Sequence, residues 1–515
     1  MKLIARIKKG SLATFLTVSI VVSAIAPVYA ANPVATTDFI GNNIVFKGNT
    51  KVSNEKLQSL LKIDNNKAPT TETLREGAQA IEKYYHDQGY ILARVSNVSP
   101  GDHGTIFITV NEGKLEDIVV KGNKKVKTNV ITREIKVKRG EPFDSNKARR
   151  SMEKLYNLGY FEDVKMKLNA GVEPNSVVLE IDVKEQKTGT YSLGGSYSES
   201  DGMGGYVELG DTDFLGTGDK AKIGWNFGGD SKIKGYNFSY TMPWMDSKET
   251  SLTFNWYNMT NRYSDYGYNG DYSTLRSTYY KNVRGFDITM GRAQGEYVHN
   301  YLTFKNRRDT YVDYYSGPVN YATTTDSNYT SYLDDNFGLT RSVALSRVYD
   351  SRDNVFSPTK GTYFSTTAEF AGRGLGGDFN FDKYTVEDRN YFKVGHSQVI
   401  ATRFIGGYAD GNMPVSQKFS AGGSDSLRGY HDEQFTGNRL LAATTEYRFP
   451  LAKKVEGVLF GDIGNAWDGG SCKLNDLKSD VGFGVRLNTP LGPIRLDYAW
   501  GEYGGRTSFS FGGKF

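Results

Sequence analysis

One segment of the sequence concentrates residues suited to ion pairing: GGSDSLRGYHDEQF, which runs from Gly422 to Phe435. In it, Arg428 follows Leu427 and precedes Gly429 and Tyr430. A guanidinium presents a planar fork of N–H donors that suits bidentate pairing with a carboxylate. Glycine lets the backbone approach a neighbouring surface closely, and tyrosine adds a flat ring with a polar tip. If this segment is a buried loop, Arg428 needs acidic partners, because an unpaired buried charge costs several kcal/mol.

The candidate partners of Arg428 are acidic residues further along the chain. VLFGDIGNAWD, from Val458 to Asp468, reads as an apolar strand interrupted by the polar side chain of Asp462. A second candidate, Asp480, stands just before the segment VGFGVRL. These residues alone leave a simpler alternative open, in which Arg428 is a solvated loop residue and Asp462 belongs to a turn.

The other chemically active residue types form no catalytic or metal-binding pattern. The sequence has no nucleophile-elbow or phosphate-loop motif, and its single cysteine, Cys472, excludes an intramolecular disulfide. The histidines lack the spacing of metal ligands. They are His86, His103, His299, His396 and His431. We therefore predict a protein that is not an enzyme and needs no metal ion or cofactor, and we expect the Arg307-Arg308 pair to face solvent.

The first thirty residues have the composition of a secretory signal peptide. A basic start is followed by an apolar run from Leu12 to Ala26 and by a small-residue cleavage site at Val28-Tyr29-Ala30. A membrane anchor is the alternative, but the run is shorter than the ~20 apolar residues of a spanning helix. Removal of residues 1–30 takes away four basic and no acidic residues, so the net charge of +5 falls to about +1. Such a balance does not indicate nucleic-acid binding.

Two copies of one pattern follow, which we assign to domains at residues 38–113 and 114–187. IVFKGNTKVSNEKL begins at Ile44, and IVVKGNKKVKTNVI begins at Ile118. Each copy continues with an apolar stripe at helical period, a Gly-Tyr pair and two strands.

The longer helix of each copy has start and stop signals. Thr71 and Asp144 suit N-caps, and Gly89 and Gly159 stand where the two helices should end. Each copy therefore reads as strand, helix, helix, strand, strand, and tandem copies of this size are treated as small domains. A generic small α+β binding module is the alternative.

Residues 188–515 are rich in Tyr, Gly, Asn, Thr and Ser and show no helical periodicity. Segments of about ten residues alternate polar and apolar side chains, the length at which a tilted strand crosses a bilayer. Examples are KAKIGWNFGG, TSLTFNWYNMTN and GTYFSTTAEFAG. At roughly 20 residues per strand and turn, the region holds about sixteen strands, which must close into a barrel because an open edge in lipid leaves backbone groups unpaired. A soluble β-sandwich or propeller is the alternative.

Several motifs resemble the BamA family, the outer-membrane protein assembly factors. VKGNKKVKTNVITREIKVKRGEPFDSNKARRSMEKLYNLGYFEDV resembles a POTRA domain of that family, and the first repeat matches the pattern more loosely. DSRDNVFSPTKGTYFS and RLNTPLGPIRLDYAW resemble its strand-and-turn motifs, and GGSDSLRGY resembles its sixth extracellular loop, which folds back into the lumen. The resemblance implies two periplasmic POTRA domains followed by a 16-stranded antiparallel outer-membrane β-barrel.

The resemblance also implies two functional features of the barrel. In the first, a loop is locked in the lumen, with Asp462 as the acidic partner of the arginine. The expected members are Leu427, Arg428, Gly429, Tyr430, Asp462 and Asp480. The second is a lateral seam between the first and last strands, weakened by glycine. Its expected members are Gly194, Gly195, Gly512, Gly513 and Phe515.

The function that the resemblance implies is assembly, in which β-barrel proteins fold and insert into the outer membrane by strand templating at the seam. Its partners would be unfolded outer-membrane β-barrel proteins, outer-membrane lipid, and periplasmic accessory lipoproteins or chaperones. A two-partner secretion transporter is the alternative, and the presence of only two repeats favours it. Against it, the few residues between Ala30 and the first strand near Ile40 leave no room for a plug helix. A passive porin or receptor would leave the repeats unexplained.

Overall fold

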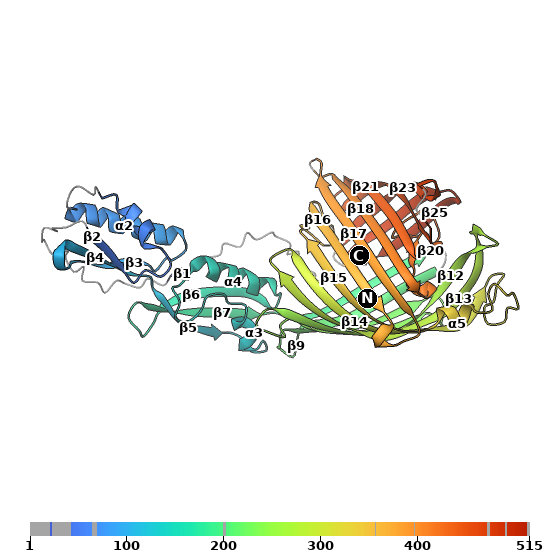
Figure 1. Cartoon of the computed structure of the whole chain (residues 1–515), viewed down its shortest axis with the longest axis horizontal. Helices are drawn as coiled ribbons and strands as arrows, with labels where there is room; N and C mark the ends of the chain where they lie inside the picture. Colours follow the sequence, from blue (N-terminus) through green and yellow to red (C-terminus); the bar gives the residue numbers. More distant parts are fainter. Residues whose placement is uncertain are drawn as a thin grey trace, which may run out of the picture. The chain divides into compact units, whose positions relative to one another are not determined.

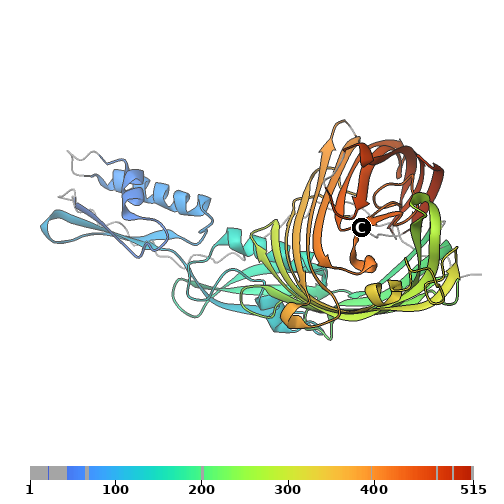
Figure 2. The same ribbon diagram turned by 45° about the vertical axis from the view of Figure 1, so that its right-hand side comes forward.

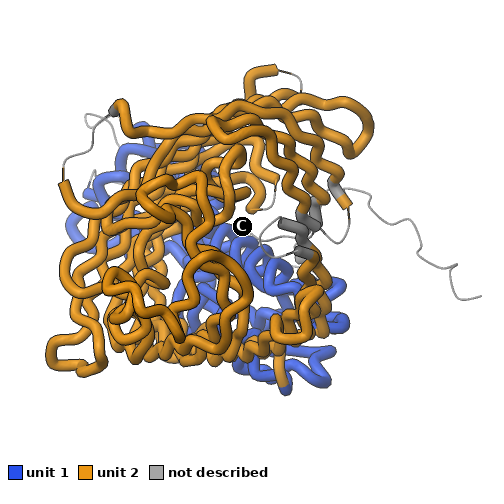
Figure 3. The backbone as a smooth tube through the Cα atoms, turned by 90° about the vertical axis from the view of Figure 1, so that its right-hand side faces the viewer, with its two compact units in different colours: residues 1–188, 215–218 blue, residues 189–214, 219–515 orange. Residues whose placement is uncertain are grey.

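The structure is a computed structural model (Figure 1). It describes residues 21–22, 43–63, 69–198, 202–355, 357–395, 397–470, 474–489 and 492–511. Most of the predicted signal peptide lies outside these ranges, and so do Gly512, Gly513 and Phe515 of the predicted seam. The chain forms two compact units, residues 1–188 with 215–218 and residues 189–214 with 219–515 (Figure 3). No helix within the described ranges is long and apolar enough to span a membrane.

The first repeat is a three-stranded sheet with two helices packed against it (Figure 1). Its elements are β2 (Asn43–Lys47), α1 (Asn54–Leu61), α2 (Thr71–Asp87), β3 (Arg94–Pro100) and β4 (Thr105–Asn111). β4 is central, parallel to β2 and antiparallel to β3. The apolar stripe of α2 contributes Leu74, Ile81 and Tyr85 to the core, each at most 2% exposed.

The second repeat has the same order of elements. They are β5 (Lys114–Lys121), α3 (Thr128–Thr132), α4 (Ser145–Asn157), β6 (Phe161–Ala170) and β7 (Ser176–Glu185). β7 is central, parallel to β5 and antiparallel to β6, and the short β1 (Val21–Val22) lies alongside β6. The predicted order strand, helix, helix, strand, strand is confirmed in both repeats.

The predicted N-caps are right for one helix and displaced for the other. The side chain of Asp144 caps α4 as predicted. The cap of α2 is Thr70 instead of Thr71, because the Thr70 hydroxyl accepts the backbone N–H of Thr73 at 3.1 Å. A threonine pair gives the sequence no means of choosing between the two positions.

The Lys-Gly-Asn turn in each repeat requires its glycine. Gly48 and Gly122 have φ angles of 84° and 85°, in the left-handed region that glycine adopts without strain. A Cβ atom on Gly48 would lie 2.3 Å from the carbonyl oxygen of Val110, and one on Gly122 would lie 2.0 Å from that of Val183. No other residue fits either turn.

A buried glutamate fixes the turn of the first repeat. Glu112 is 5% exposed and accepts the backbone N–H groups of Thr50 and Lys51 at 2.7 and 2.8 Å. It also accepts the hydroxyl of Tyr85 at 2.8 Å. Burial, together with the hydrogen bond to Glu112, raises the pKa of Tyr85 well above its usual value, so this hydroxyl stays a donor.

The second repeat reproduces this arrangement. Glu185 follows Glu112 by 73 residues and accepts the backbone N–H groups of residues 124–126 at 2.8 to 2.9 Å. In each repeat, a glutamate near the end of the central strand accepts the backbone N–H groups that follow the glycine turn. This explains why the turn and the glutamate recur together.

The second unit is a closed barrel of sixteen strands, each antiparallel to both neighbours (Figures 1 and 2). This confirms the predicted fold class. The strands are β8 (Gly189–Ser198), β9 (Gly202–Phe214), β10 (Asp219–Gly228), β11 (Lys234–Met242), β12 (Thr250–Tyr268), β13 (Asp271–Gln294), β14 (Val298–Ser316), β15 (Gly338–Asp350), β16 (Gly361–Ala371), β17 (Asn380–Lys393), β18 (Val399–Asn412), β21 (Arg439–Ala452), β22 (Val455–Trp467), β23 (Lys478–Thr489), β24 (Gly492–Gly501) and β25 (Gly504–Phe511). Strand β25 pairs with β8 to close the barrel.

Alternation along the strands separates an apolar outer face from a polar inner face. Phe254 and Trp256 of β12 are 37% and 42% exposed on the outer face. On the inner face, Lys305 of β14 forms an ion pair with Glu369 of β16 at 2.9 Å. This is the pattern of a barrel with lipid outside and a polar lumen.

Three strands are much longer than the predicted ten or so residues. β12, β13 and β14 have 19, 24 and 19 residues. Their far ends pack with the connection 317–337, which contains α5 (Tyr332–Asn336), in a tyrosine-rich cluster. The Tyr321 and Tyr332 rings stack with centroids 3.6 Å apart, and both hydroxyls donate to Asp265. The prediction failed because tyrosines that pack on one another continue the strands beyond the length needed to cross lipid.

We expect Glu112→Ala to destabilise the first repeat by about 2–4 kcal/mol, because buried donors would lose a charged acceptor. Hydrogen exchange of residues 43–63 and 69–113 in the intact protein measures the loss. Glu112→Gln keeps an acceptor oxygen and should cost less. Glu185→Ala is the matched change in the second repeat and should leave exchange in the first repeat unchanged. Unaltered exchange in Glu112→Ala would contradict the assigned role.

Candidate functional site

The segment that carries Arg428 is a loop between β18 and β21 that lies against the inner wall of the barrel. Its base is closed by two short antiparallel strands, β19 (Phe419–Ala421) and β20 (Phe435–Gly437). Leu427, Tyr430 and Phe435 are at most 2% exposed and share one apolar cluster with side chains of the neighbouring strands. The loop is therefore packed as a core element, which answers the question of whether Arg428 is solvated.

Two glycines shape the turn before Arg428. Gly422 and Gly423 have φ angles of 122° and 85°. The N–H of Gly422 donates to the Ser426 hydroxyl at 2.9 Å, and that of Gly423 donates to the Leu427 carbonyl at 3.0 Å. The turn thus directs the side chain of Leu427 into the apolar cluster and that of Arg428 toward the wall.

The guanidinium of Arg428 meets acidic groups along its edges. Nε and Nη2 donate to the two carboxylate oxygens of Asp462 at 2.8 and 2.9 Å, a bidentate pair. Nη1 donates to Glu446 at 2.7 Å and lies 3.9 Å from Asp497. The guanidinium carbon lies 3.4 Å from the ring centroid of Phe460. Arg428 is only 7% exposed, so these carboxylates compensate a charge that is largely shielded from water.

Four adjacent strands each contribute one acidic residue to this wall. They are Glu446 of β21, Asp462 of β22, Asp480 of β23 and Asp497 of β24. The register places Asp462 directly opposite Asp480. Like charges directly opposite destabilise a sheet, so the wall needs positive charge and N–H donors from the loop to be stable.

Gly429 and Tyr430 attach the loop to the same wall. Asp480, expected as a second partner of the arginine, instead accepts the backbone N–H of Gly429 at 3.0 Å. A Cβ on Gly429 would lie 2.6 Å from the backbone nitrogen of Gly501, so the close approach requires glycine. The Tyr430 hydroxyl donates to the carbonyl oxygen of Ser479 at 3.1 Å.

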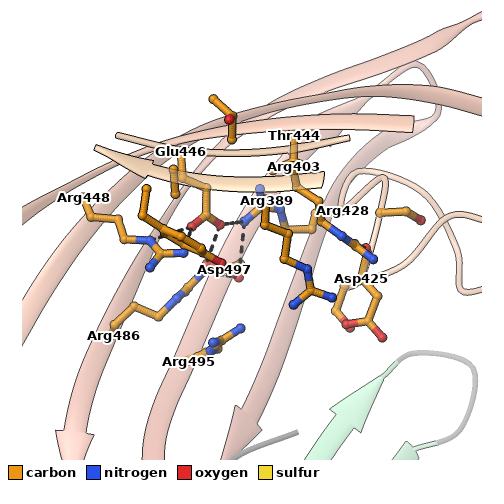
Figure 4. Close-up of a pocket in the computed structure, with 15 residues that line it drawn as sticks. Arg389, Arg403, Asp425, Arg428, Thr444, Glu446, Arg448, Arg486, Arg495 and Asp497 are labelled. Atoms are coloured by element: carbon orange, nitrogen blue, oxygen red, sulfur yellow. Dashed lines mark hydrogen bonds and ion pairs between the residues drawn. The ribbon is translucent and has the colours of Figure 1, made fainter. Parts of the chain in front are cut away.

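A lumenal cavity of about 490 Å³ lies beside Arg428, and its wall is rich in arginine (Figure 4). Glu446 is shared, because it accepts Arg448 at 2.8 Å and lies 3.8 Å from Arg486. Arg486 also pairs with both carboxylate oxygens of Asp497. The arginines that line the cavity are Arg389, Arg403, Arg428, Arg448, Arg486 and Arg495.

Sequence reasoning missed Glu446 and Asp497. Both sit in strands with strong alternation, RLLAATTEYRFPLA and PIRLDYAW, where a single acid reads as an ordinary polar position. The available signal was the position of each acid on the polar face of its strand, two residues from an arginine on the same face. That signal becomes informative only when the order of the strands around the barrel is known.

The arrangement can hold a loop in one position, because its interactions are ion pairs, backbone hydrogen bonds and apolar contacts. Within the described part of the chain, no group of three or more His, Cys, Asp or Glu residues could hold a metal ion. The absence of a cofactor and of enzymatic activity stays a prediction.

The predicted seam residues that the structure describes are Gly194 and Gly195, both in β8. Gly195 pairs with Gly205 of β9 on one side and with Phe511 of β25 on the other. The acidic wall occupies β21 to β24, and the β25–β8 junction, where the seam is predicted, follows next in strand order.

Two α+β repeats, a closed barrel and an arginine loop fastened in its lumen define a class of POTRA-containing outer-membrane barrels. The description "Omp85 superfamily domain" matches residues 213–515, and "Surface antigen variable number repeat", the POTRA family, matches residues 40–113 and 114–186. The chain belongs to the Omp85 superfamily, with two POTRA repeats ahead of the barrel.

Relatives and solved structures agree with this assignment. The outer membrane protein assembly factor BamA of Nitratidesulfovibrio vulgaris is 27% identical over 92% of this chain, and BamA of Neisseria meningitidis is 23% identical over 75%. The chain spans 60% and 54% of the length of these two relatives.

Among solved structures, BamA from Haemophilus ducreyi lacking POTRA domains 1–3 shares the fold, with a TM-score of 0.64 and 18% identity over 92% of this chain and 99% of that one. CdiB from Escherichia coli shares it with a TM-score of 0.60 and 15% identity over 95% and 93% of the two chains. The chain is accordingly an outer-membrane protein with its POTRA domains in the periplasm.

We expect Arg428→Ala to release the loop from the wall at a cost of about 3–5 kcal/mol, because it leaves buried carboxylates without their partner. Arg428→Lys should also be poorly tolerated, since lysine lacks the planar fork. Limited proteolysis and hydrogen exchange of residues 413–438 measure the release.

The matched control is Arg373→Ala. Arg373 pairs with Asp382 at 2.6 Å in an exposed loop, with 59% of its side chain exposed, so its removal should cost at most about 1 kcal/mol. Equal protection of residues 413–438 in wild type and Arg428→Ala would refute the lock.

Proposed function

We propose that this protein folds and inserts β-barrel proteins into the outer membrane by offering strand edges at a lateral seam between β8 and β25. One observation carries the proposal. Among the described residues, β25 and β8 pair at three positions: Phe509 with Tyr197, Ser510 with Ser196, and Phe511 with Gly195. This junction joins the first and last strands of the barrel, so the sheet can open there without breaking a connection between consecutive strands.

Opening of the β25–β8 junction would expose strand edges that a substrate could use. Gly194 and Gly195 of β8 lie at this junction, and glycine weakens a strand because it has no side chain to pack. Unpaired backbone groups are costly in lipid, and an incoming strand has the same need for partners. Pairing between the two would satisfy both, as in β-augmentation. The reaction needs only exchange of backbone hydrogen bonds, so we infer that the protein is not an enzyme.

In this proposal, the contacts of the Arg428 loop with the barrel wall, which we call the lumenal lock, hold the strands beside the seam in place. Its proposed members are Leu427, Arg428, Gly429, Tyr430, Asp462 and Asp480. They fasten one loop to β22 and β23, and Glu446 and Asp497 extend the attachment to β21 and β24. Strands that adjoin β25 are thereby held while the β25–β8 junction opens.

The POTRA domains supply sheet edges on the periplasmic side. β2 and β3 are the edge strands of the first domain, and β5 is an edge strand of the second. We propose that they hold unfolded outer-membrane β-barrel proteins and periplasmic accessory lipoproteins or chaperones by strand addition. Outer-membrane lipid is the third partner, because it surrounds the apolar outer face.

A disulfide across the seam should stop assembly. Ser196→Cys and Ser510→Cys, which are paired residues, are combined with Cys472→Ser so that no other thiol competes. We expect the oxidised protein to lose most insertion of an outer-membrane barrel substrate into liposomes, and a reductant to restore it.

A second disulfide serves as the matched control. Thr367→Cys and Thr385→Cys join β16 and β17, which already pair along their length, and should leave insertion unchanged. Full insertion by the oxidised Ser196–Ser510 variant would sink the seam mechanism.

A secretion transporter is the second candidate. The two POTRA domains in the described chain and the shared fold with CdiB favour it. Depletion of the protein, followed by an inventory of the outer membrane and the culture medium, separates the candidates. We expect a general loss of β-barrel proteins from the membrane. Loss of one secreted protein with the other barrels intact would favour the transporter.

A further inference from the structure

The outer wall formed by β12 to β15 carries arginines directly beyond its apolar belt. Arg284 of β13 is paired with Arg308 of β14. Asn306, two residues before Arg308 on the same face, is paired with Arg341 of β15. Side chains alternate between the two faces of a strand. Trp256 lies on the outer face, so its partners in register, Phe286, Asn306 and Arg341, face outward as well. Arg284 and Arg308 each lie two residues from a member of this set and therefore share the outer face.

Aromatic residues form the edge of the belt below this row. Trp256 is paired with Phe286, which lies two residues from Arg284 on the same face. The Phe286 ring lies 6.0 Å from Phe254 and 6.2 Å from Phe304, measured between centroids. Aromatic side chains at this depth mark the boundary between hydrocarbon and headgroups.

The charges of this row are not balanced by the protein. Arg284 and Arg308 are exposed, and no ion pair joins either of them to a carboxylate among the described residues. Like charges directly opposite in a sheet are destabilising. The neighbouring Arg307 shows the contrast, because it faces the lumen and pairs with Asp309 at 2.9 Å. The expectation that Arg307 and Arg308 both face solvent is thus wrong for Arg307.

The row lies along a groove. Arg284, Arg308 and Arg341 line a space of about 470 Å³ together with Trp256 and Phe286. Within it, Arg341 Nε donates to the Asn306 side-chain oxygen at 3.1 Å, which holds the guanidinium against the wall. One groove therefore offers Arg284 and Arg308 beyond the aromatic pair Trp256 and Phe286, with Arg341 in register with that pair.

The direction of the strands assigns the groove to the outer leaflet. β8 leaves the periplasmic repeats at Gly189, and successive strands alternate in direction, so β12 runs away from the periplasm. Trp256 precedes Asn258 along β12, and Asn258 is paired with Arg284. Arg284 and its partner Arg308 consequently lie farther along the strands from the periplasm than the aromatic pair Trp256 and Phe286 does.

We propose that this groove binds the phosphate-bearing headgroup of an outer-leaflet lipid. The guanidinium forks contact phosphate oxygens, and the acyl chains lie on the aromatic edge. Charged side chains on the lipid face of a barrel are tolerated near the interface, and basic pockets there suit anionic headgroups. A soluble anion would use the arginines but not the aromatic edge, so the combination specifies a lipid.

Lipid titration of the purified full chain, followed by native mass spectrometry, tests this site. The probes are a bisphosphorylated diglucosamine lipid, its dephosphorylated form and free pyrophosphate. We expect wild type to prefer the phosphorylated lipid by about tenfold or more, and Arg284→Gln/Arg308→Gln to lose that preference. Arg347→Gln is the control, because Arg347 is exposed on the same face of β15 beyond the other edge of the belt. It should bind as wild type does.

The outcomes separate cleanly. Equal binding of the two lipids by wild type overturns the proposal, and so does an undiminished preference in the double variant. Pyrophosphate that binds as tightly as the lipid, with the same arginine dependence, would show a soluble-anion site instead. Folding of each variant is checked by the mobility of the unheated barrel in SDS. Should the double variant not fold, the single changes Arg284→Gln and Arg308→Gln must each reduce the preference.

Discussion

The constraint on which the rest of this structure depends is that a backbone in lipid has no water to bond with. Each N–H and C=O group in the membrane must find a partner in a neighbouring strand, so the sheet has to close. The barrel meets this requirement round β8 to β25 with antiparallel ladders, and it is closed where the chain's first and last barrel strands join. The same requirement that forces closure would make this junction, once opened, attractive to another unpaired strand. The closed fold and the proposed function both follow from the free-energy cost of unpaired backbone groups in lipid.

Closure alone does not determine what fills the lumen. The inner face of β21 to β24 collects four carboxylates, which repel one another in a confined space. The loop resolves this by supplying a guanidinium to Asp462 and Glu446 and a backbone N–H to Asp480. A buried ion pair of this kind gives little net stability but penalises every arrangement in which one partner is missing. It therefore specifies one position of the loop, which suits the proposal that the neighbouring β25–β8 junction opens.

Much of the fold could be predicted because it follows from local pattern. The repeated Lys-Gly-Asn turns, the helical stripes and the alternating strands each depend on residues close in sequence, and Arg428 stood out because glycine and tyrosine bracket it. The missed features depend on residues far apart. Glu446 becomes a partner of Arg428 only when β21 lies beside β22, and Glu112 becomes a clamp only when β4 ends at the turn after β2. The length of β12 to β14 was misjudged because tyrosines support strands both in lipid and against one another.

Arg307 and Arg308 show how far a single residue step can separate two functions. They are adjacent in sequence and identical in chemistry, yet the pleat sends one into the lumen and the other to the outer surface. Arg307 has Asp309 as its acceptor, supplied by its own strand two residues on. Arg308 faces another arginine, Arg284. If both were solvated side chains without a role, no difference in their partners would be expected. Arg307 has a carboxylate partner in the lumen, whereas Arg308 has none among the described residues. In our proposal the bilayer supplies the missing anion, which makes the lipid headgroup part of the wall.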